Sequence, residues 1–423
     1  MRIAIITIGS RGDVQPYIAL GQGLIKAGHT VRLATHQDFE AFVKSHGLEF
    51  WLIRGNPQEM TGSQEMREVL EKGNFVATWR QIIRDAKRII NEWMEDSLAA
   101  CQGMDLLIAG GVSLSAGISV AEKYHLPLLQ AFVFPVTPTR AFPSILLPQT
   151  LPNLGGAFNL LSSHLVLQLA WLGARTMINR ARKKVLDLPP ASFVEPYLSR
   201  RTKDFPTLYG FSPSVIPAPA DWTTHDHVTG YWFLDPPEDW TPPADLLNFL
   251  QAGSPPVYIG FGSMGSRDPA ETTDLVLQAL AKTGQRAILL SGWSGLQKVD
   301  LPASVIMVDT IPHSWLFSHV AAVVHHGGAG TTAAGLRAGV PSIVIPFLGD
   351  QPFWGQHIRN LGVGLAPIPR SKLTVDRLAQ AIQEAVTNTA MRQRAAELGS
   401  KIQAENGIAN AVEIIERIEG IKS

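Results

Sequence analysis

The first third of the chain repeats an order of short apolar runs and amphipathic helical stretches. Residues 3–8 and 30–34 are apolar enough for buried strands, and residues 14–27 between them have the spacing of a helix. A strand, a helix and a second strand in this order form a βαβ unit, whose strands are parallel. A helix is predicted at 39–46, and further strands at 49–53, 105–109 and 128–132. This part of the chain therefore predicts a parallel sheet.

The second half of the chain starts the same order again. Strands are predicted at 257–261, 286–291, 305–308, 320–325 and 342–345, and helices at 271–282, 373–388 and 391–407. Residues 212–256, between the halves, are rich in proline and show little periodicity, which is typical of a linker. The fold class we predict is α/β, with two doubly wound domains.

An apolar helical stretch at 158–174 is followed directly by basic residues. This pattern allows two interpretations. The helix could line an apolar acceptor pocket or lie on an anionic membrane surface. It could equally be packed inside its domain, with cations placed favourably at its carboxyl end. The basic residues are Arg175, Arg180, Arg182, Lys183 and Lys184.

Composition excludes several classes of protein. Lys+Arg and Asp+Glu are equal at 36 each, so the chain lacks the basic excess of a nucleic-acid-binding protein. The single cysteine, Cys101, excludes an internal disulfide framework and favours a reducing compartment such as the cytoplasm. The apolar start continues into a glycine turn, which indicates a first strand and not a signal peptide. No uninterrupted apolar run approaches the roughly 20 residues of a membrane span.

The sequence HHGGAGTT at 325–332 has the composition of a phosphate-binding turn. It lies between a predicted strand and a predicted helix, where backbone N–H groups and the positive helix end point at one place. A histidine at the strand end adds a donor or a positive charge. Asp350 and Gln351 follow the next strand and can hold neighbouring hydroxyls. Because ligands lie at the carboxyl edge of a doubly wound sheet, the pattern predicts a nucleotide-sugar site.

Four stretches in this order resemble a known family. The run HHGGAGTTAAGLRAGVPSIVIPFLGDQPFWG closely resembles the nucleotide-sugar signature of the family 1 UDP-glycosyltransferases, in their bacterial and sterol-glucosyltransferase branch. The amino-terminal ITIGSRGDVQPYIALGQGLIKAGHTVRLATH is similar to the other half of that signature, and GFGSM and IPHSWLF add to the match. The resemblance implies the GT-B fold, in which two Rossmann-like domains face each other across a cleft.

The resemblance also implies a division of the chain and of its roles. Residues 1–235 would form the acceptor domain, 236–256 the linker and 257–405 the donor domain, with 406–423 a helix crossing back to the first domain. The donor-binding residues implied are Ser263, Ile311, His325, Gly328, Ala329, Gly330, Thr331, Asp350 and Gln351. Further candidates are Ser10, Arg11, Trp293 and His326. Ser263 could also be a plain turn residue, and Asp350 a helix N-cap.

Asp13 stands where plant relatives carry the histidine that acts as base. A general base must take the proton of the acceptor hydroxyl as its oxygen attacks the sugar. The alternative is that Asp13 only caps the helix at 14–27, where the helix dipole would keep its pKa low. Arg11, beside it, would orient Asp13 or hold an acceptor group, or lie on the surface.

The expected function is that of an inverting glycosyltransferase. It would move a hexose, with glucose expected, from a UDP-sugar to a hydroxyl of a lipophilic acceptor, with sterol the leading choice, and give a β-glycoside. Alternatives are a secondary-metabolite glycosyltransferase using a UDP- or TDP-sugar, a sugar-nucleotide epimerase, and a binding protein without turnover. No metal, further cofactor or nucleic acid is expected. The protein is expected in the cytoplasm, with peripheral contact to a membrane.

Overall fold

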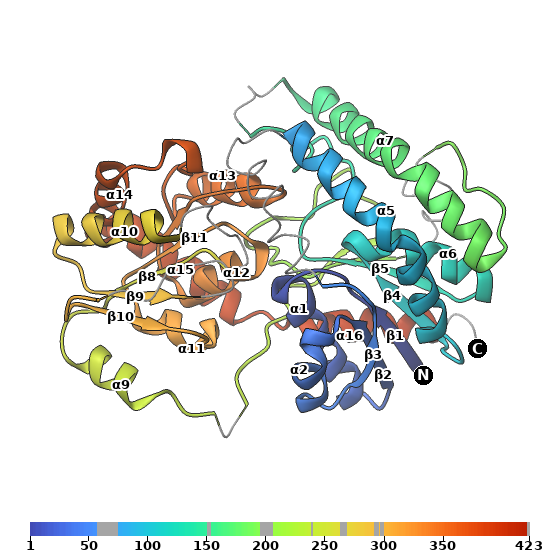
Figure 1. Ribbon diagram of the computed structural model, residues 1–423, viewed down its shortest axis with the longest axis horizontal. Helices are drawn as coiled ribbons and strands as arrows, with labels where there is room; N and C mark the ends of the chain where they lie inside the picture. The colour runs from blue at the N-terminus through green and yellow to red at the C-terminus, as the bar shows by residue number, and fades with distance from the viewer. Residues whose placement is uncertain are drawn as a thin grey trace. The chain divides into compact units, whose positions relative to one another are not determined.

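The chain forms two compact units, each built on one parallel sheet. The computed structural model describes residues 1–56, 75–149, 154–194, 206–237, 240–262, 269–291, 296 and 300–420. The first unit comprises Met1–Pro57, Trp79–Leu234 and Glu405–Ser423, and the second contains Asp235–Ala404. Helices lie against the sheet in each unit (Figure 1). The predicted α/β class is confirmed.

The sheet of the first unit has the order β3-β2-β1-β4-β5-β6-β7, with all neighbours parallel. Its strands are β1 (Arg2–Ile6), β2 (Thr30–Thr35), β3 (Glu49–Leu52), β4 (Leu106–Ala109), β5 (Leu128–Phe132), β6 (Thr207–Tyr209) and β7 (Asp226–Val228). The helices are α1 (Arg11–Lys26), α2 (Glu40–Ser45), α5 (Phe75–Ala100), α6 (Leu114–Tyr124), α7 (Gly156–Ala181) and α16 (Gly407–Gly420). Short helical turns are η1 (Gln37–Phe39), η2 (Gly111–Ser113) and η3 (Arg182–Leu186).

Strand alternation explains how both faces of this sheet are covered. Neighbouring residues of β4 point to opposite faces, as in any strand. Ile108 lies in the core cluster formed with α1, whereas Ala109 lies against Gly117 of α6. The order of the strands reverses between β1 and β4, because β1 leads outward to β2 and β4 leads outward to β5. The carboxyl ends of β1 and β4 are therefore the ligand-binding edge expected for such a sheet.

The second unit has a sheet of order β10-β9-β8-β11-β12, also parallel. Its reversal lies between β8 and β11. The strands are β8 (Val257–Gly260), β9 (Ala287–Leu290), β10 (Val305–Val308), β11 (Ala322–His325) and β12 (Ser342–Val344). The helices are α9 (Ala244–Gln251), α10 (Pro269–Thr283), α11 (His313–Leu316), α12 (Ala329–Ala338), α13 (Gln351–Leu361), α14 (Val375–Thr387) and α15 (Thr389–Gln403), with turns η5 (Phe317–His319) and η6 (Arg370–Lys372).

The expectation of an irregular linker over 212–256 was wrong. Residues 226–228 form β7, the edge strand of the first sheet, and Tyr231 and Trp232 are buried in the first unit. Residues 244–251 form α9, whose Leu246 packs into a core cluster of the second unit. These elements were hidden because both are short, and α9 directly follows Pro242 and Pro243.

Two further helices bear on function. Helix α16 packs on α1 through Ala411, Val412 and Ile415. Among the described residues, Gly156–Leu186 is long and apolar enough to cross a membrane by length and composition, and 22% of its most apolar window is buried. The chain has no uninterrupted apolar run of about 20 residues, as the sequence indicated, yet the mean hydropathy of this helix is high enough for a span. Polar residues such as Ser162 and Gln168 interrupt the apolar run without lowering its mean hydropathy below 1.2.

Candidate active site

Asp13 lies in the first turn of α1, at the carboxyl end of β1. The helix begins at Arg11, with Ser10 as its N-cap, so Asp13 is the third helical residue and does not itself cap a helix at 14–27. The Ser10 backbone N–H donates to Asp13 Oδ2 at 2.8 Å, and the Ser10 hydroxyl donates to the same oxygen at 3.0 Å. Asp13 Oδ1 has no hydrogen-bond partner among the described residues. One carboxylate oxygen thus holds the turn, while the other remains for a ligand.

Burial raises the pKa of Asp13 above that of an ordinary aspartate, although the two hydrogen bonds from Ser10 oppose this shift. The turn closes tightly around the carboxylate. A Cβ at Gly9, whose φ is +148°, would lie 2.3 Å from Asp13 Oδ2, so only glycine fits there. A carboxylate with a raised pKa is a stronger base, which is the property that proton abstraction requires.

A prediction follows for Ser10→Ala. The Ser10 hydroxyl bonds the charged form of Asp13, so its removal should raise the pKa of Asp13 further. If Asp13 must be deprotonated to act, lowering the pH should abolish the activity of this variant at a higher pH than that of the wild type. The check is the acid limb of the kcat/KM profile, which should shift toward neutral pH. Ser45→Ala, at an exposed serine that bonds Phe42 O, is the matched control; equal shifts in both variants would contradict the prediction.

The surroundings of Asp13 tie it to the neighbouring strands. The Tyr17 hydroxyl donates to Ala131 O at 2.6 Å. Burial raises the pKa of Tyr17, and the nearby charge of Asp13 adds to this shift. Arg11 is directed elsewhere, because its Nε donates to Gln15 Oε1 and its guanidinium lies 4.9 Å from the centre of the Phe42 ring. This geometry favours a surface role for Arg11 over the orienting role that the sequence allowed.

The glycine turn of the second unit joins β11 to α12, beside the reversal in its sheet. Gly328 is the N-cap of α12, and Thr332 N donates to Gly328 O at 2.9 Å to close the first turn. The N–H groups of Ala329, Gly330 and Thr331 come before that first helical bond. They are the donors that the amino terminus of a helix leaves for an anion. This arrangement of free N–H groups is the one that a phosphate site would need.

The two histidines of this turn have different surroundings. His325, the last residue of β11, is 0% exposed, and its Nε2 is buried without a partner among the described residues. Gly327 N donates to His325 Nδ1 at 3.0 Å, which places the ring proton on Nε2. Burial, followed by the nearby His326 and His313, holds the pKa of His325 well below its usual value. His325 is therefore neutral, and its side chain is not exposed at the turn.

His326 is partly exposed and lies between two glycine turns. A Cβ at Gly328 would lie 2.5 Å from His326 Nε2, and one at Gly262 would lie 2.9 Å from His326 Cε1. The absence of side chains at both glycines makes room for this ring. Burial lowers the pKa of His326 to about 4, so it is a neutral hydrogen-bonding group at neutral pH. The placement favours His326 over His325 as the histidine facing a ligand.

Asp350 and Gln351 lie beside the glycine turn, at the start of α13. A Cβ at Gly327 would lie 3.0 Å from Gln351 O, so the two turns are in contact. Gln351 is buried, and its Oε1 accepts from Phe347 N at 2.7 Å and Leu348 N at 3.1 Å. Asp350 is at the N-cap position but makes no side-chain cap bond; its Oδ2 accepts from Trp354 Nε1 at 2.8 Å. Both side chains are thus held in fixed orientations.

The structure says less about the remaining residues that were predicted to bind the donor. Ile311 follows β10, and its side chain is buried in a core cluster, which leaves only its backbone to meet a base. Ser263 and Trp293 lie outside the described residues. The sequence did not indicate a hydrogen-bonded pair near His325. The Tyr258 hydroxyl and His313 Nε2 are 3.0 Å apart. His313 is also near enough to His325 to influence its pKa. His313 was visible only as part of the IPHSWLF stretch.

Comparison with known proteins agrees with this architecture. Residues 3–143 match the glycosyltransferase family 28 N-terminal domain, and residues 275–419 match the C-terminal domain of erythromycin biosynthesis protein CIII-like proteins. The calicheamicin glycosyltransferase CalG4 has a TM-score of 0.67 at 18% identity, covering 99% of this chain and 98% of that one. A Streptomyces glycosyltransferase, SsfS6, complexed with thymidine diphosphate, has a TM-score of 0.65 at 18% identity, covering 99% of both chains. These solved glycosyltransferases share the fold of this chain, in which two α/β domains are each built on a parallel sheet.

The sequence is also similar to a group of fungal proteins. Sterol 3-beta-glucosyltransferase of Aspergillus fumigatus is 40% identical over 434 residues, which is 99% of this chain and 30% of the fungal protein. The protein of the same name from Neurospora crassa is 40% identical over 439 residues, 99% of this chain and 27% of that protein. The chain thus spans less than a third of the length of these relatives. The resemblance found in the sequence is confirmed.

Proposed function

We propose that this protein transfers glucose from UDP-glucose to the 3-hydroxyl of a sterol, giving a β-glucoside. The observation that carries the proposal is the 40% identity, across nearly the whole chain, to proteins named sterol 3-beta-glucosyltransferase. The geometry supports it. Asp13 and the glycine turn each lie at the reversal of their own sheet, where doubly wound domains bind ligands.

In the proposed reaction Asp13 is the general base. Its Oδ1 takes the proton of the sterol hydroxyl while the sterol oxygen forms a bond to the anomeric carbon of glucose. The bond between that carbon and the β-phosphate oxygen breaks, and UDP leaves with the electron pair. Because the attack comes from the face opposite UDP, the α-linked donor gives a β-linked product. The reaction is thus inverting.

The second unit would bind the donor. The N–H groups at the start of α12 and the His326 ring would stabilise the negative charge that grows on the diphosphate. Asp350 and Gln351 would bind hydroxyls of the sugar, and backbone atoms at Ile311 would meet the uracil. These groups supply the neutralisation that a metal gives in other transferases, so we propose a reaction without metal or further cofactor.

We also propose that the protein works in the cytoplasm, in peripheral contact with a membrane. Sterols are held in bilayers, so an enzyme that glycosylates them must reach the bilayer surface. Support comes from the composition, with a single buried cysteine, and from the exposed apolar residues of α7.

The test is acceptor-dependent release of UDP from UDP-glucose by the purified protein. A sterol, a flavonoid and a macrolide are compared, each dispersed in the same detergent, alongside a sample without acceptor. We expect release to depend on the sterol. Release only with the flavonoid or macrolide would favour a secondary-metabolite transferase, and interconversion of the sugar nucleotide without release would favour an epimerase. Binding of UDP without turnover would overturn the proposal.

A further inference from the structure

Helix α7 turns four of its leucines outward. Leu161, Leu165, Leu169 and Leu172 are 67%, 55%, 57% and 37% exposed. Their spacing of three or four residues places them on one side of the helix, and we call them the leucine face. Exposed apolar patches of this kind mark a site of interaction with another molecule or with a membrane.

The buried side of α7 is polar over residues 159–163, whereas Trp171 is buried further along the helix. Asn159, Ser162 and Ser163 are buried. Asn159 Nδ2 donates to Arg140 O at 3.0 Å, and both serine hydroxyls donate to Asn159 O. A helix packed only to fill a core would place leucines inward and hydroxyls outward. This stretch of α7 has the opposite arrangement, so burial within the unit does not account for its leucines.

A neighbouring segment extends the leucine face. Phe193 and Val194 are 65% and 48% exposed. Their segment is held along α7 by hydrogen bonds from the helix, since Gln168 Nε2 donates to Phe193 O at 3.1 Å and Trp171 Nε1 donates to Ser192 O at 3.2 Å. The exposed apolar surface is therefore a patch with a fixed shape.

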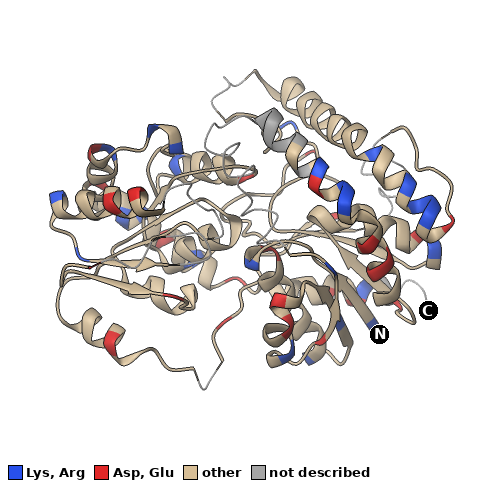
Figure 2. Ribbon diagram, viewed as in Figure 1, with Lys and Arg blue, Asp and Glu red and all other residues tan. Residues whose placement is uncertain are grey.

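Beyond the leucine face the helix becomes basic. Residues 156–186 contain five Arg and Lys and no acidic residue (Figure 2). Arg182 is buried and paired with Glu122, and Lys183 is paired with Asp187. Arg180 and Lys184 are exposed and in no ion pair among the described residues. Two positive charges at this end are thus available to an anion.

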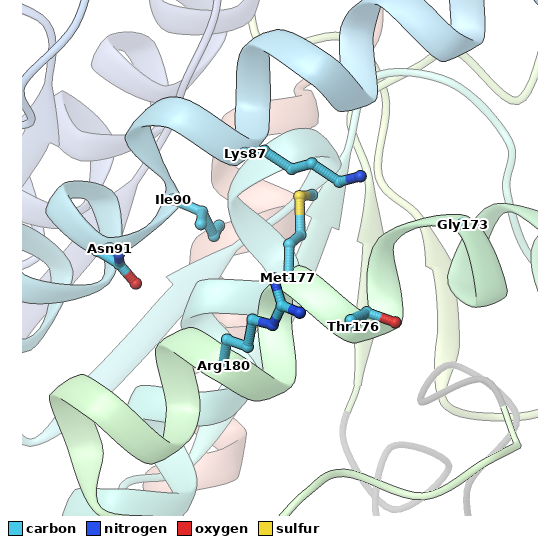
Figure 3. A pocket seen from close by; sticks show the side chains of 7 residues that line it. All are labelled: Lys87, Ile90, Asn91, Gly173, Thr176, Met177 and Arg180. Carbon is cyan, nitrogen blue, oxygen red and sulfur yellow. The ribbon is translucent and has the colours of Figure 1, made fainter.

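A pocket of about 410 Å³ opens between α7 and α5 at this basic end (Figure 3). Lys87 enters it from α5 and Arg180 from α7, and Ile90 and Met177 give it an apolar part. None of the residues that line it is acidic. Neither Lys87 nor Arg180 is in an ion pair among the described residues. Two unneutralised cations beside apolar side chains fit a phosphate that is joined to an acyl chain.

We propose that this side of α7 docks on an anionic lipid bilayer. The leucine face and Phe193 enter the boundary between headgroups and acyl chains, and the basic end lies over the headgroups. The pocket between α5 and α7 holds the phosphate of an anionic lipid between Lys87 and Arg180. The occupant is a lipid surface because apolar and cationic residues lie in sequence along one helix, matching the acyl chains and the charge of a bilayer. This inference rests on the proposed function, because docking would give the protein access to a sterol held in the membrane.

The experiment measures co-sedimentation of the full chain with vesicles of phosphatidylcholine, with and without phosphatidylserine. One variant carries Leu161→Gln, Leu165→Gln and Leu169→Gln. A second carries Lys87→Gln, Arg180→Gln and Lys184→Gln. A control variant, Lys372→Gln with Arg392→Gln and Lys401→Gln, removes the same charge from exposed positions of the second unit.

We expect the wild type to bind the anionic vesicles and the leucine variant to bind them at least about tenfold more weakly. The basic variant should lose the dependence on phosphatidylserine, with an affinity for anionic vesicles reduced by about tenfold or more. The control should bind like the wild type. Wild-type binding by all three variants would overturn the proposal. So would a wild type that ignores vesicles but forms a dimer that the leucine variant cannot form.

A second readout separates this inference from the proposed reaction. Transfer to a sterol dispersed in detergent should be the same in the wild type and in both variants, because neither changes the residues around Asp13 or the glycine turn. Loss of vesicle binding with transfer intact supports the docking surface. Vesicle binding without any transfer by the wild type would overturn the proposed function and leave the docking surface standing.

Discussion

Asp13→Asn should slow glucosyl transfer by at least about 100-fold, while UDP binds with unchanged affinity. General-base catalysis typically contributes a factor of about 100 to 10,000, and an amide cannot take the acceptor proton. The change is close to isosteric, and Ser10 can still donate to the remaining oxygen, so the turn at Gly9 should keep its shape. The check is single-turnover transfer to sterol, together with calorimetric titration of UDP.

The matched control for this variant is Asp105→Asn. Asp105 pairs with Arg2 at 2.9 Å on the surface of the same unit, with 41% of its side chain exposed. Its loss removes one negative charge without touching the turn at Asp13, so transfer should stay near the wild-type rate. Wild-type turnover by Asp13→Asn would place the base elsewhere and reduce Asp13 to the role of closing a capping box with Ser10.

The second large effect is expected for His326→Ala, which should weaken UDP binding by roughly tenfold to a hundredfold, the range for a lost hydrogen bond to a charged group. His326 lies between Gly262 and Gly328 and is partly exposed, whereas His325 is fully buried. Isothermal titration of UDP into the folded variant measures the loss. His319→Ala, at an exposed histidine of the same unit, should bind UDP normally and serves as the control.

His325→Ala distinguishes the two histidines. Its ring lies in the core at the end of β11, so its removal should lower thermal stability, by opening a cavity, more than His326→Ala does. The reverse order, with UDP affinity lost at His325 and kept at His326, would contradict the assignment of the phosphate contact.

Much of the fold could be predicted from the sequence because buried parallel strands are continuous apolar runs. The strands at 128–132 and 305–308 were predicted with their observed bounds, and the others within one or two residues at most ends. The strands β6 and β7 have three residues each, too short to show a period, and they were missed. Helix α1 begins at Arg11, earlier than predicted, because Ser10 and Asp13 have the spacing of a capping box that Pro16 obscured.

The site was predictable at the level of motifs and not of individual side chains. The spacing of glycines predicted a turn between a strand and a helix, and the structure has it at Gly327 and Gly328. Adjacent residues at a strand end point in different directions, however, and only the structure shows that His325 points inward. Likewise, the amino-acid sequence of residues 158–174 could not show which side of the helix faces the core. The structure settles this, because Asn159 and Ser162 are buried and Leu161 and Leu165 are exposed.

The central claim is tested most directly by the product formed from UDP-α-glucose and a sterol such as cholesterol. Mass spectrometry should find one hexose added to the sterol, and the proton coupling at the anomeric carbon should show a β linkage. A sterol recovered unchanged while UDP-glucose is consumed with another acceptor would contradict the proposed substrate. An α-linked sterol glucoside would contradict the inverting mechanism and the role of Asp13 as its base.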